Sequence, residues 1–151
     1  MNVEKIMTRE VATCAPGDML NRAAQLMWEH DCGVIPVVNG DNVVGMITDR
    51  DCCMAAYTKG GRLDEIPVEE VMARDVKSCA PGDAIARAEE RMSRNQIRRI
   101  PVLADGKLAG IVSMNDIALA ADRGQANPAE LAETLAAICH HRDEPQSLAA
   151  E

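Results

Sequence analysis

Aromatic side chains are almost absent from this 151-residue chain, which has no Phe, one Trp (Trp28) and one Tyr (Tyr57). A row of aromatic rings on which nucleic-acid bases could stack is therefore excluded. Apolar residues still make up 47% of the chain. Length and composition together predict one ordinary domain, or two small halves that share a core of aliphatic side chains, Met and Ala.

Runs of basic residues and long apolar runs are also missing. The formal net charge is −8, and no Lys/Arg cluster offers the many phosphate contacts that nonspecific binding to DNA or RNA requires. No stretch approaches the ~18 apolar residues of a membrane span, and no cationic start precedes an apolar run. We expect a soluble cytoplasmic protein that binds neither nucleic acid nor membranes.

Signatures of catalysis are missing too. The sequence contains no Gly-x-Ser-x-Gly, no Gly-Lys-Ser/Thr phosphate loop and no His-Glu-x-x-His. We therefore expect no enzymatic activity and no required cofactor. None of the six cysteines forms a Cys-x-x-Cys pair, so reduced thiols are expected.

An internal repeat is the strongest feature that is present. Residues 3–52 align with residues 68–117 at a constant offset of 65, with 18 identities in 50 positions and no gap. Two copies are too few for a solenoid, so we expect the two halves to pack face to face. The predicted domains are residues 1–61 and 62–124, followed by a C-terminal helix and tail at 125–151.

Each repeat predicts the order strand, helix, strand, strand, helix. In repeat one, residues 11–13 form a short strand, Asp18 caps a helix whose apolar face includes Trp28, and residues 34–38 and 43–48 form a hairpin. The second helix begins at Asp49, or at Met114 in repeat two. Outside the repeats, apolar residues spaced at i, i+4, i+7 and i+8 predict an amphipathic helix over 129–141 and a loose tail over 142–151.

Both repeats end a strand with Gly-h-h-Ser/Thr-x-x-Asp, where h is apolar, at residues 45–51 and 110–116. Glycine in a strand leaves room for a close approach, and the hydroxyl and carboxylate at a helix start suit the phosphate and ribose of a nucleotide. The same spacing resembles a helix capping box with Asp in place of Glu, and one pair of side chains can serve both roles. The prolines Pro36 and Pro101 indicate strand edges, either as plain edges or as places where backbone groups read a ligand.

The h-Pro-Val strand followed by the terminal motif resembles the cystathionine-β-synthase (CBS) domain, and two such repeats over residues 1–124 resemble a Bateman module. The chain is most similar to small stand-alone members of the hypoxic-response type. This resemblance implies an α/β (α+β) fold of two βαββα units packed through their sheets with pseudo-two-fold symmetry. It also implies a homodimer and a non-catalytic sensor that binds adenosyl ligands such as AMP, ADP, ATP or S-adenosylmethionine.

Carried over by position, the resemblance assigns ribose binding to Asp51 and Asp116, phosphate contact to Thr48 and Ser113, and lining of the adenine pocket to the h-Pro pairs and the first strands. Arg50 and Arg99 lie beside these positions and suit an anion. The predicted ligand-binding residues are Thr13, Ile35, Pro36, Thr48, Arg50, Asp51, Ser78, Arg99, Ile100, Pro101, Ser113 and Asp116. Because the charges near the two motifs differ, we expect unequal affinities.

Two other functions stay open. The cysteines with Cys139-His140-His141 could form a metal- or thiol-redox-responsive module, although zinc would need about four ligands that converge across the fold. Alternatively, the chain is a purely structural dimerisation module whose motifs only cap helices. If the chain is a sensor, its signal passes to an unidentified downstream protein.

Overall fold

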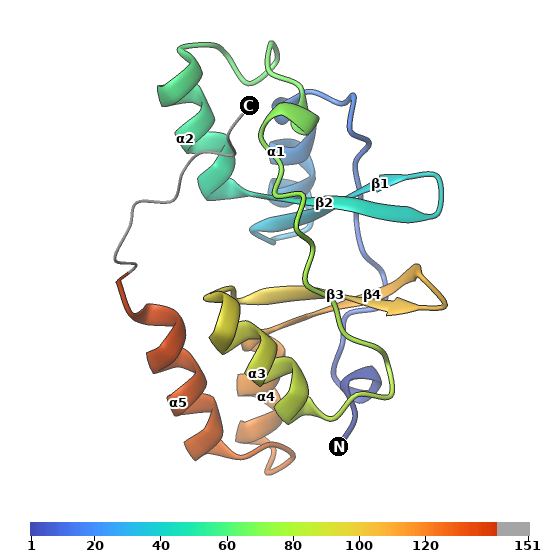
Figure 1. The fold of residues 1–151 in the computed structure, drawn as a ribbon, viewed down its shortest axis with the longest axis vertical. Helices are drawn as coiled ribbons and strands as arrows, with labels where there is room; N and C mark the ends of the chain where they lie inside the picture. The colour runs from blue at the N-terminus through green and yellow to red at the C-terminus, as the bar shows by residue number, and fades with distance from the viewer. Residues whose placement is uncertain (142–151) are drawn as a thin grey trace. The chain divides into compact units, whose positions relative to one another are not determined.

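The computed structural model describes residues 1–141, and these fall into two compact units. Within the described residues, unit 1 combines Met1–Glu10 with the chain from Lys77 onward, and unit 2 is Val11–Val76. The tail predicted for residues 142–151 lies outside the described residues. Each unit is presented by itself below, with the element labels of Figure 1.

Unit 2 consists of an antiparallel hairpin and two helices. Its elements are α1 (Leu20–Glu29), β1 (Val34–Asn39), β2 (Asn42–Thr48), α2 (Asp49–Lys59) and the 3-10 turn η2 (Val68–Glu70). In the hairpin, Val34 lies opposite Thr48 and Asn39 lies opposite Asn42. Helix α1 packs against α2 and β1, and α2 packs against β2 (Figure 1). The predicted hairpin and the predicted start of α2 at Asp49 are both confirmed.

Unit 1 has the same arrangement and one additional helix. Its elements are η1 (Val3–Lys5), α3 (Ile85–Asn95), β3 (Arg99–Ala104), β4 (Lys107–Ser113), α4 (Met114–Asp122) and α5 (Pro128–Cys139). Asp105 and Gly106 join the two strands with φ of 50° and 79°, the two positive values that a type I′ turn requires. The predicted C-terminal helix is confirmed as α5, which packs against α3 and α4.

Each unit has its own aliphatic core between helices and hairpin. On α1 the buried residues are Leu20, Ala23, Leu26 and Met27, whereas Trp28 is 89% exposed. The prediction that Trp28 lies on the apolar face was therefore wrong, because the buried face of α1 runs through Ala23 and Leu26 and leaves Trp28 outside it. On α5 the buried residues are Thr134 and Ile138, with Leu131 packed beside them, while Leu135 and Cys139 of the predicted face are exposed.

The first residues of each repeat, called its lead-in below, belong to the compact unit that holds the body of the other repeat. In unit 1, Thr8 and Ile111 donate backbone hydrogen bonds to each other's carbonyl oxygens, each 2.9 Å long. In unit 2, Met46 and Ala73 form the equivalent pair at 3.0 and 2.9 Å. The compact units are consequently not the two sequence repeats, because the start of repeat one packs with the body of repeat two.

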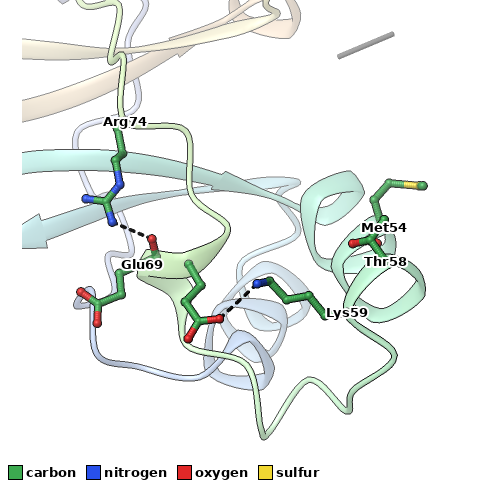
Figure 2. Close-up of polar contacts among 6 residues, drawn as sticks. Met54, Thr58, Lys59, Glu69 and Arg74 are labelled. Carbon is green, nitrogen blue, oxygen red and sulfur yellow. Dashed lines mark hydrogen bonds and ion pairs between the residues drawn. The ribbon is translucent and has the colours of Figure 1, made fainter. Parts of the chain in front are cut away.

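The exchanged segments are held by repeated side-chain contacts. Arg74 donates to the Glu69 carbonyl oxygen at 2.8 Å, and Figure 2 shows this bond beside the ion pair that joins Lys59 of α2 to Glu70 at 3.1 Å. In unit 1 the corresponding arginine, Arg9, donates to the Glu4 carbonyl oxygen at 3.1 Å. Each lead-in is thus a small folded turn attached to its unit.

Two local expectations differ from the structure. Instead of a strand over residues 11–13, a single parallel bridge joins Cys14 to Val37. Asp18 does not cap α1: its Oδ2 accepts from the Ala15 amide at 2.8 Å, and the helix begins two residues later. The Pro16-Gly17 turn therefore uses the carboxylate that the sequence pattern assigned to the helix.

Candidate functional site

The two Gly-h-h-Ser/Thr-x-x-Asp motifs form complete capping boxes. Thr48 Oγ1 accepts from the Asp51 amide at 3.2 Å, and Asp51 Oδ2 accepts from the Thr48 amide at 2.9 Å. In unit 1 the corresponding distances for Ser113 and Asp116 are 3.3 and 2.8 Å. The capping interpretation of the motif is thus correct. A carboxylate offers about four acceptor positions, so a cap bond leaves Asp51 and Asp116 able to accept from a ligand.

The two boxes differ in how they use the hydroxyl proton. Ser113 donates its hydroxyl to Asp116 Oδ2 at 2.6 Å, a short bond of the kind that a charged acceptor makes. A ligand that takes up the Asp116 carboxylate would compete with this bond.

The hairpin alternation places several of the predicted residues on one face of each unit. Cys14 and Val37 are bridged and both lie in the core, so Pro36, one position before Val37 on β1, lies on the opposite face. Thr48 ends β2 on that same face, across from Val34. Thr13 directly precedes the bridged Cys14 and lies outside the strands. In unit 1 the same reasoning groups Arg99, Pro101 and Ser113, because Cys79 and Val102 are bridged in the core, and Ser78 directly precedes the bridged Cys79.

Ile35 and Ile100 lie on the other face. Both are fully buried members of the aliphatic cores, so the strand carries its proline, and not its isoleucine, on the candidate face. The backbone at the proline is also engaged, since the carbonyl oxygen of Pro36 accepts from the Cys14 amide at 3.2 Å. The role of these isoleucines in a ligand pocket stays a prediction.

Charge distinguishes the two candidate faces. In unit 1, half-buried Arg99 lies directly across the strand pair from Ser113, whereas in unit 2 the buried Val34 lies across from Thr48. Side chains of directly opposed residues are neighbours on one face. The predicted cationic site residue of unit 2 is Arg50, which is exposed in the first turn of α2.

Arg91 is a candidate that the sequence prediction missed. It extends from α3 and donates to the backbone carbonyl of Ser78, which brings a second half-buried guanidinium to the segment that carries Ser78. At the offset of 65, Arg91 corresponds to Leu26, a buried core residue of α1. A cation in one repeat at a position that is apolar in the other repeat is the sequence signal that could have identified Arg91.

The cysteines divide into a buried and an exposed group. Burial, followed by the nearby Asp18 carboxylate, raises the pKa of Cys14 to about 11. Burial likewise raises the pKa of Cys52 and Cys79 to about 11. These thiols are protonated at neutral pH, and only a thiolate reacts as a nucleophile or binds a metal.

The metal-binding candidates Cys139, His140 and His141 are exposed at the end of α5. Within residues 1–141, no three His, Cys, Asp or Glu side chains gather in a way that could hold a metal ion. The His140 backbone is used structurally, since its carbonyl oxygen accepts from Gln96 Nε2 at 2.8 Å.

A hollow in unit 1 involves none of the predicted site residues. It has a volume of about 530 Å³ and is lined by Met1, Asn2, Lys5 and Gln125. Among the helices of residues 1–141, none is both long enough and apolar enough to span a bilayer.

Comparison with known proteins agrees with the repeat and with this fold. The CBS domain model matches residues 3–57 and 68–123. The CBS domain-containing protein YhcV of Bacillus subtilis is 39% identical over 118 residues, which cover 78% of this chain and 84% of YhcV. Hypoxic response protein 1 of Mycobacterium tuberculosis is 37% identical over 117 residues, which cover 75% of this chain and 80% of that protein.

Two solved structures are also similar. The crystal structure of Hypoxic Response Protein I with two coordinated zinc ions has a TM-score of 0.71 and 30% identity, covering 79% of this chain and 98% of its own. The CBS domain pair of protein MJ0100, in complex with 5′-methylthioadenosine and S-adenosyl-L-methionine, has a TM-score of 0.75 and 24% identity, covering 82% and 98%. With its two matched repeats and the shared mixed α/β fold, this chain belongs to the CBS domain family.

Proposed function

We propose that this chain is a regulatory, non-catalytic module that binds an adenosyl ligand and signals to a partner protein through a change in conformation. The observation that carries the proposal is the duplicated site. In each unit a hydroxyl and a carboxylate at a helix N-terminus border one hairpin face that also carries a proline, and a Thr or Ser directly precedes the cysteine bridged to that hairpin. A helix N-terminus attracts a phosphate, and a carboxylate accepts from ribose hydroxyls. The adenosyl compounds bound to the MJ0100 pair support this ligand class at the level of the fold.

The two sites are expected to prefer ligands of different charge. Arg99 faces Ser113 across the strands of unit 1, and Arg91 lies close to Ser78, so this site suits AMP, ADP or ATP. The corresponding positions of unit 2 are Val34 and Leu26, which suit an uncharged or cationic adenosyl compound such as S-adenosylmethionine. A ligand shifts the conformational equilibrium only by its differential affinity for the two states, typically ~1–3 kcal/mol.

Isothermal titration of ligand-stripped protein with AMP, ADP, ATP and S-adenosylmethionine tests the proposal. Asp51→Asn and Asp116→Asn keep an acceptor for the capping amide but remove the charge, and each should weaken binding at its own site by about 10- to 100-fold. A melting-temperature shift should accompany binding, since a ligand at ~100 times its Kd stabilises the fold by about 2.7 kcal/mol. The absence of binding by all four ligands would contradict the proposal.

A matched variant addresses the charge preference. Arg99→Val introduces the residue of the equivalent position in unit 2, and we expect it to reduce affinity for ATP while affinity for S-adenosylmethionine changes little. Equal losses for both ligands would mean that Arg99 acts through the fold and not through a phosphate.

The alternatives predict other outcomes. A zinc-responsive module, for which the zinc-containing Hypoxic Response Protein I is the motivation, would bind zinc with a rise in melting temperature that Cys139→Ser abolishes. A purely structural dimerisation module would bind nothing, and its motif variants would lose only the ~1 kcal/mol of a helix cap. The homodimer and the cytoplasmic location remain predictions, and the downstream protein stays unidentified.

A further inference from the structure

One carboxylate of unit 1 is buried without a partner. Glu89 on α3 is 5% exposed, and within residues 1–141 its Oε1 accepts no hydrogen bond. Buried polar groups are almost always paired, and an unpaired one in a folded protein calls for a physical reason. The fold does not require this carboxylate, because the equivalent position of α1 at the offset of 65 is Ala24. Glu89 is therefore a candidate binding group.

The cations of the surrounding helices are engaged elsewhere or absent. Each of the three arginines of α3 already has a contact, namely Arg87 with Asp83, Arg91 with the Ser78 carbonyl oxygen and Arg94 with Glu90. Helices α4 and α5 contain no Lys or Arg. Instead, α5 brings Glu130, and burial followed by the charge of Glu130 raises the pKa of the Glu89 carboxyl. Within the described part of the chain, none of these three helices pairs Glu89 with a cation.

Helix α5 covers the side of α3 on which Glu89 lies. It packs against α3 and α4 (Figure 1), and Glu89 is buried, whereas the equivalent Ala24 of unit 2 is half-buried. The contact is a modest one. Of the twelve residues of α5, Thr134 and Ile138 are buried, with Leu131 packed beside them, so one of its two buried side chains is polar.

The connection to α5 and the sequence repeat both indicate that this helix can leave its place. Residues 123–125, which follow α4, are exposed, and Gly124 has a φ of 71°. Helix α5 also has a cap of its own, since Asn127 Oδ1 accepts from the Ala129 amide at 3.0 Å. Unit 2 has the same hairpin and helix pair and, among residues 1–141, no helix that corresponds to α5. The body of a unit is therefore complete without such a cover.

We propose that α5 is a displaceable cover over a docking site on α3 and α4, and that this site takes an amphipathic helix of a partner protein whose Lys or Arg pairs with Glu89. This adds a class of partner to the proposed function. It does not depend on adenosyl binding, because neither the site nor its test involves that ligand.

The contacts of α5 define the pattern that the partner helix should carry. Leu131, Thr134 and Ile138 are spaced at i, i+3 and i+7, the spacing by which an amphipathic helix binds a groove. The cation belongs at i−1, the position of Glu130, because the charge of Glu130 acts on Glu89. The partner helix is thus basic at a position where α5 is acidic.

The pairing with Glu89 also explains how a partner competes with a helix that is covalently attached. A tethered helix acts at an effective concentration of the order of millimolar, so the partner needs a contact that α5 lacks. Hydrogen bonds between charged groups are about twice as strong as neutral ones, and the unpaired Oε1 of Glu89 is an acceptor for such a bond. A helix with Lys or Arg at this position therefore has an advantage that α5 cannot match.

Fluorescence anisotropy of the full chain with two labelled peptides tests the pairing. Both peptides have the sequence of residues 127–141 and stand in for the partner helix, one with Glu130→Lys and one with Glu130→Gln. The second removes the like charge without supplying a cation. We expect the Glu130→Lys peptide to bind at least about 10-fold more tightly. In the Glu89→Ala chain, which has the residue of the equivalent position Ala24, this ratio should fall to about one.

The displacement of α5 is measured separately. Ile138→Asp in the chain places a charge at a buried position of α5 and should raise affinity for the Glu130→Lys peptide by about 10-fold. Leu135→Asp is the matched control, because Leu135 is 37% exposed on the same helix, and it should leave this affinity unchanged. In the wild-type chain, hydrogen exchange followed by NMR, with only the chain isotopically labelled, should show that the peptide speeds exchange of α5 amides while α3 amides stay protected.

Three results would overturn the proposal. Equal affinity for the two peptides, or a preference that survives in Glu89→Ala, would exclude the pairing with Glu89. Amides of α5 that stay as protected as those of α3 when the peptide is bound would exclude the displacement. Binding of neither peptide, to the wild-type chain or to Ile138→Asp, would exclude the docking site. Adenosyl binding enters none of these measurements, so the two proposals fail separately.

Discussion

Gly110→Ala tests whether the exchanged lead-in is fixed by close backbone contact. A Cβ at residue 110 would lie 2.7 Å from the carbonyl oxygen of Thr8 and 2.8 Å from Sδ of Met7. Ordinary contact begins at about 3.4 Å, so the Thr8 backbone would have to withdraw by roughly 0.7 Å. That movement would strain or break the two 2.9 Å hydrogen bonds between Thr8 and Ile111.

The expected cost follows from these contacts. Two hydrogen bonds contribute ~1 kcal/mol each, and overpacking adds ~1–3 kcal/mol, so Gly110→Ala should lower the free energy of unfolding by about 3–5 kcal/mol. Urea unfolding followed by far-UV circular dichroism measures this change, because the midpoint falls while the slope stays constant.

Two further glycines serve as comparisons. At Gly45 the added Cβ would meet Sδ of Met72 at 2.5 Å, the flexible part of a side chain, with the Ala73 carbonyl oxygen at 3.1 Å, so the loss should be smaller. At Gly82 no atom lies within 4 Å and φ is not positive, so Gly82→Ala should be neutral within ~0.5 kcal/mol or slightly stabilising. A Gly110→Ala midpoint equal to that of Gly82→Ala would refute the reasoning.

Three other predictions concern single side chains. Glu89 is 5% exposed with an unpartnered Oε1, and burial, with Glu130 nearby, raises the pKa of its carboxyl. Because this pKa is higher in the folded protein, the stability linked to Glu89 is fully present below the ordinary pKa of about 4.3 and is lost as the pH rises through the raised pKa. Glu89→Gln should abolish this pH dependence of unfolding and add ~1 kcal/mol to the free energy of unfolding at pH 7. Thr48→Ala removes a helix cap and should cost ~1 kcal/mol in urea unfolding, whereas no change would mean that the box contributes nothing. Buried Cys14, with a pKa of about 11, should react with iodoacetamide far more slowly than exposed Cys32 in peptide mapping of the native protein, and equal rates would contradict its burial.

The sequence predicted the elements better than it predicted their orientation. The hairpins and the starts of α2 and α4 were foreseen, because the Ser/Thr-x-x-Asp spacing and the strand-turn patterns are local signals. The orientation of Trp28 was wrong, because hydrophobicity alone cannot distinguish a core position from an exposed one on a helix that has apolar residues on most sides. Asp18 illustrates the same difficulty at a turn, where two nearby amides compete for one carboxylate.

The candidate site was foreseen only in part. The hydroxyl and carboxylate positions follow from the motif, and their mutual hydrogen bonds agree with its spacing. The isoleucines face the cores because alternation along β1 and β3 assigns one face to the proline and the other to its neighbours. Arg91 was missed because its contact with Ser78 joins residues 13 positions apart, which no local pattern reveals.

The exchange of lead-ins also sets an order for folding during synthesis. Within the described residues, unit 2 is one continuous stretch, Val11–Val76, so the contacts among these residues become possible as soon as that stretch has left the ribosome. Unit 1 must instead join Met1–Glu10 to a body that begins at Lys77, which requires closing a loop across the whole of unit 2. The first ten residues made are therefore among the last to reach their folded positions, because the Thr8 amide and carbonyl bond Ile111 of β4, which is synthesised about a hundred residues later.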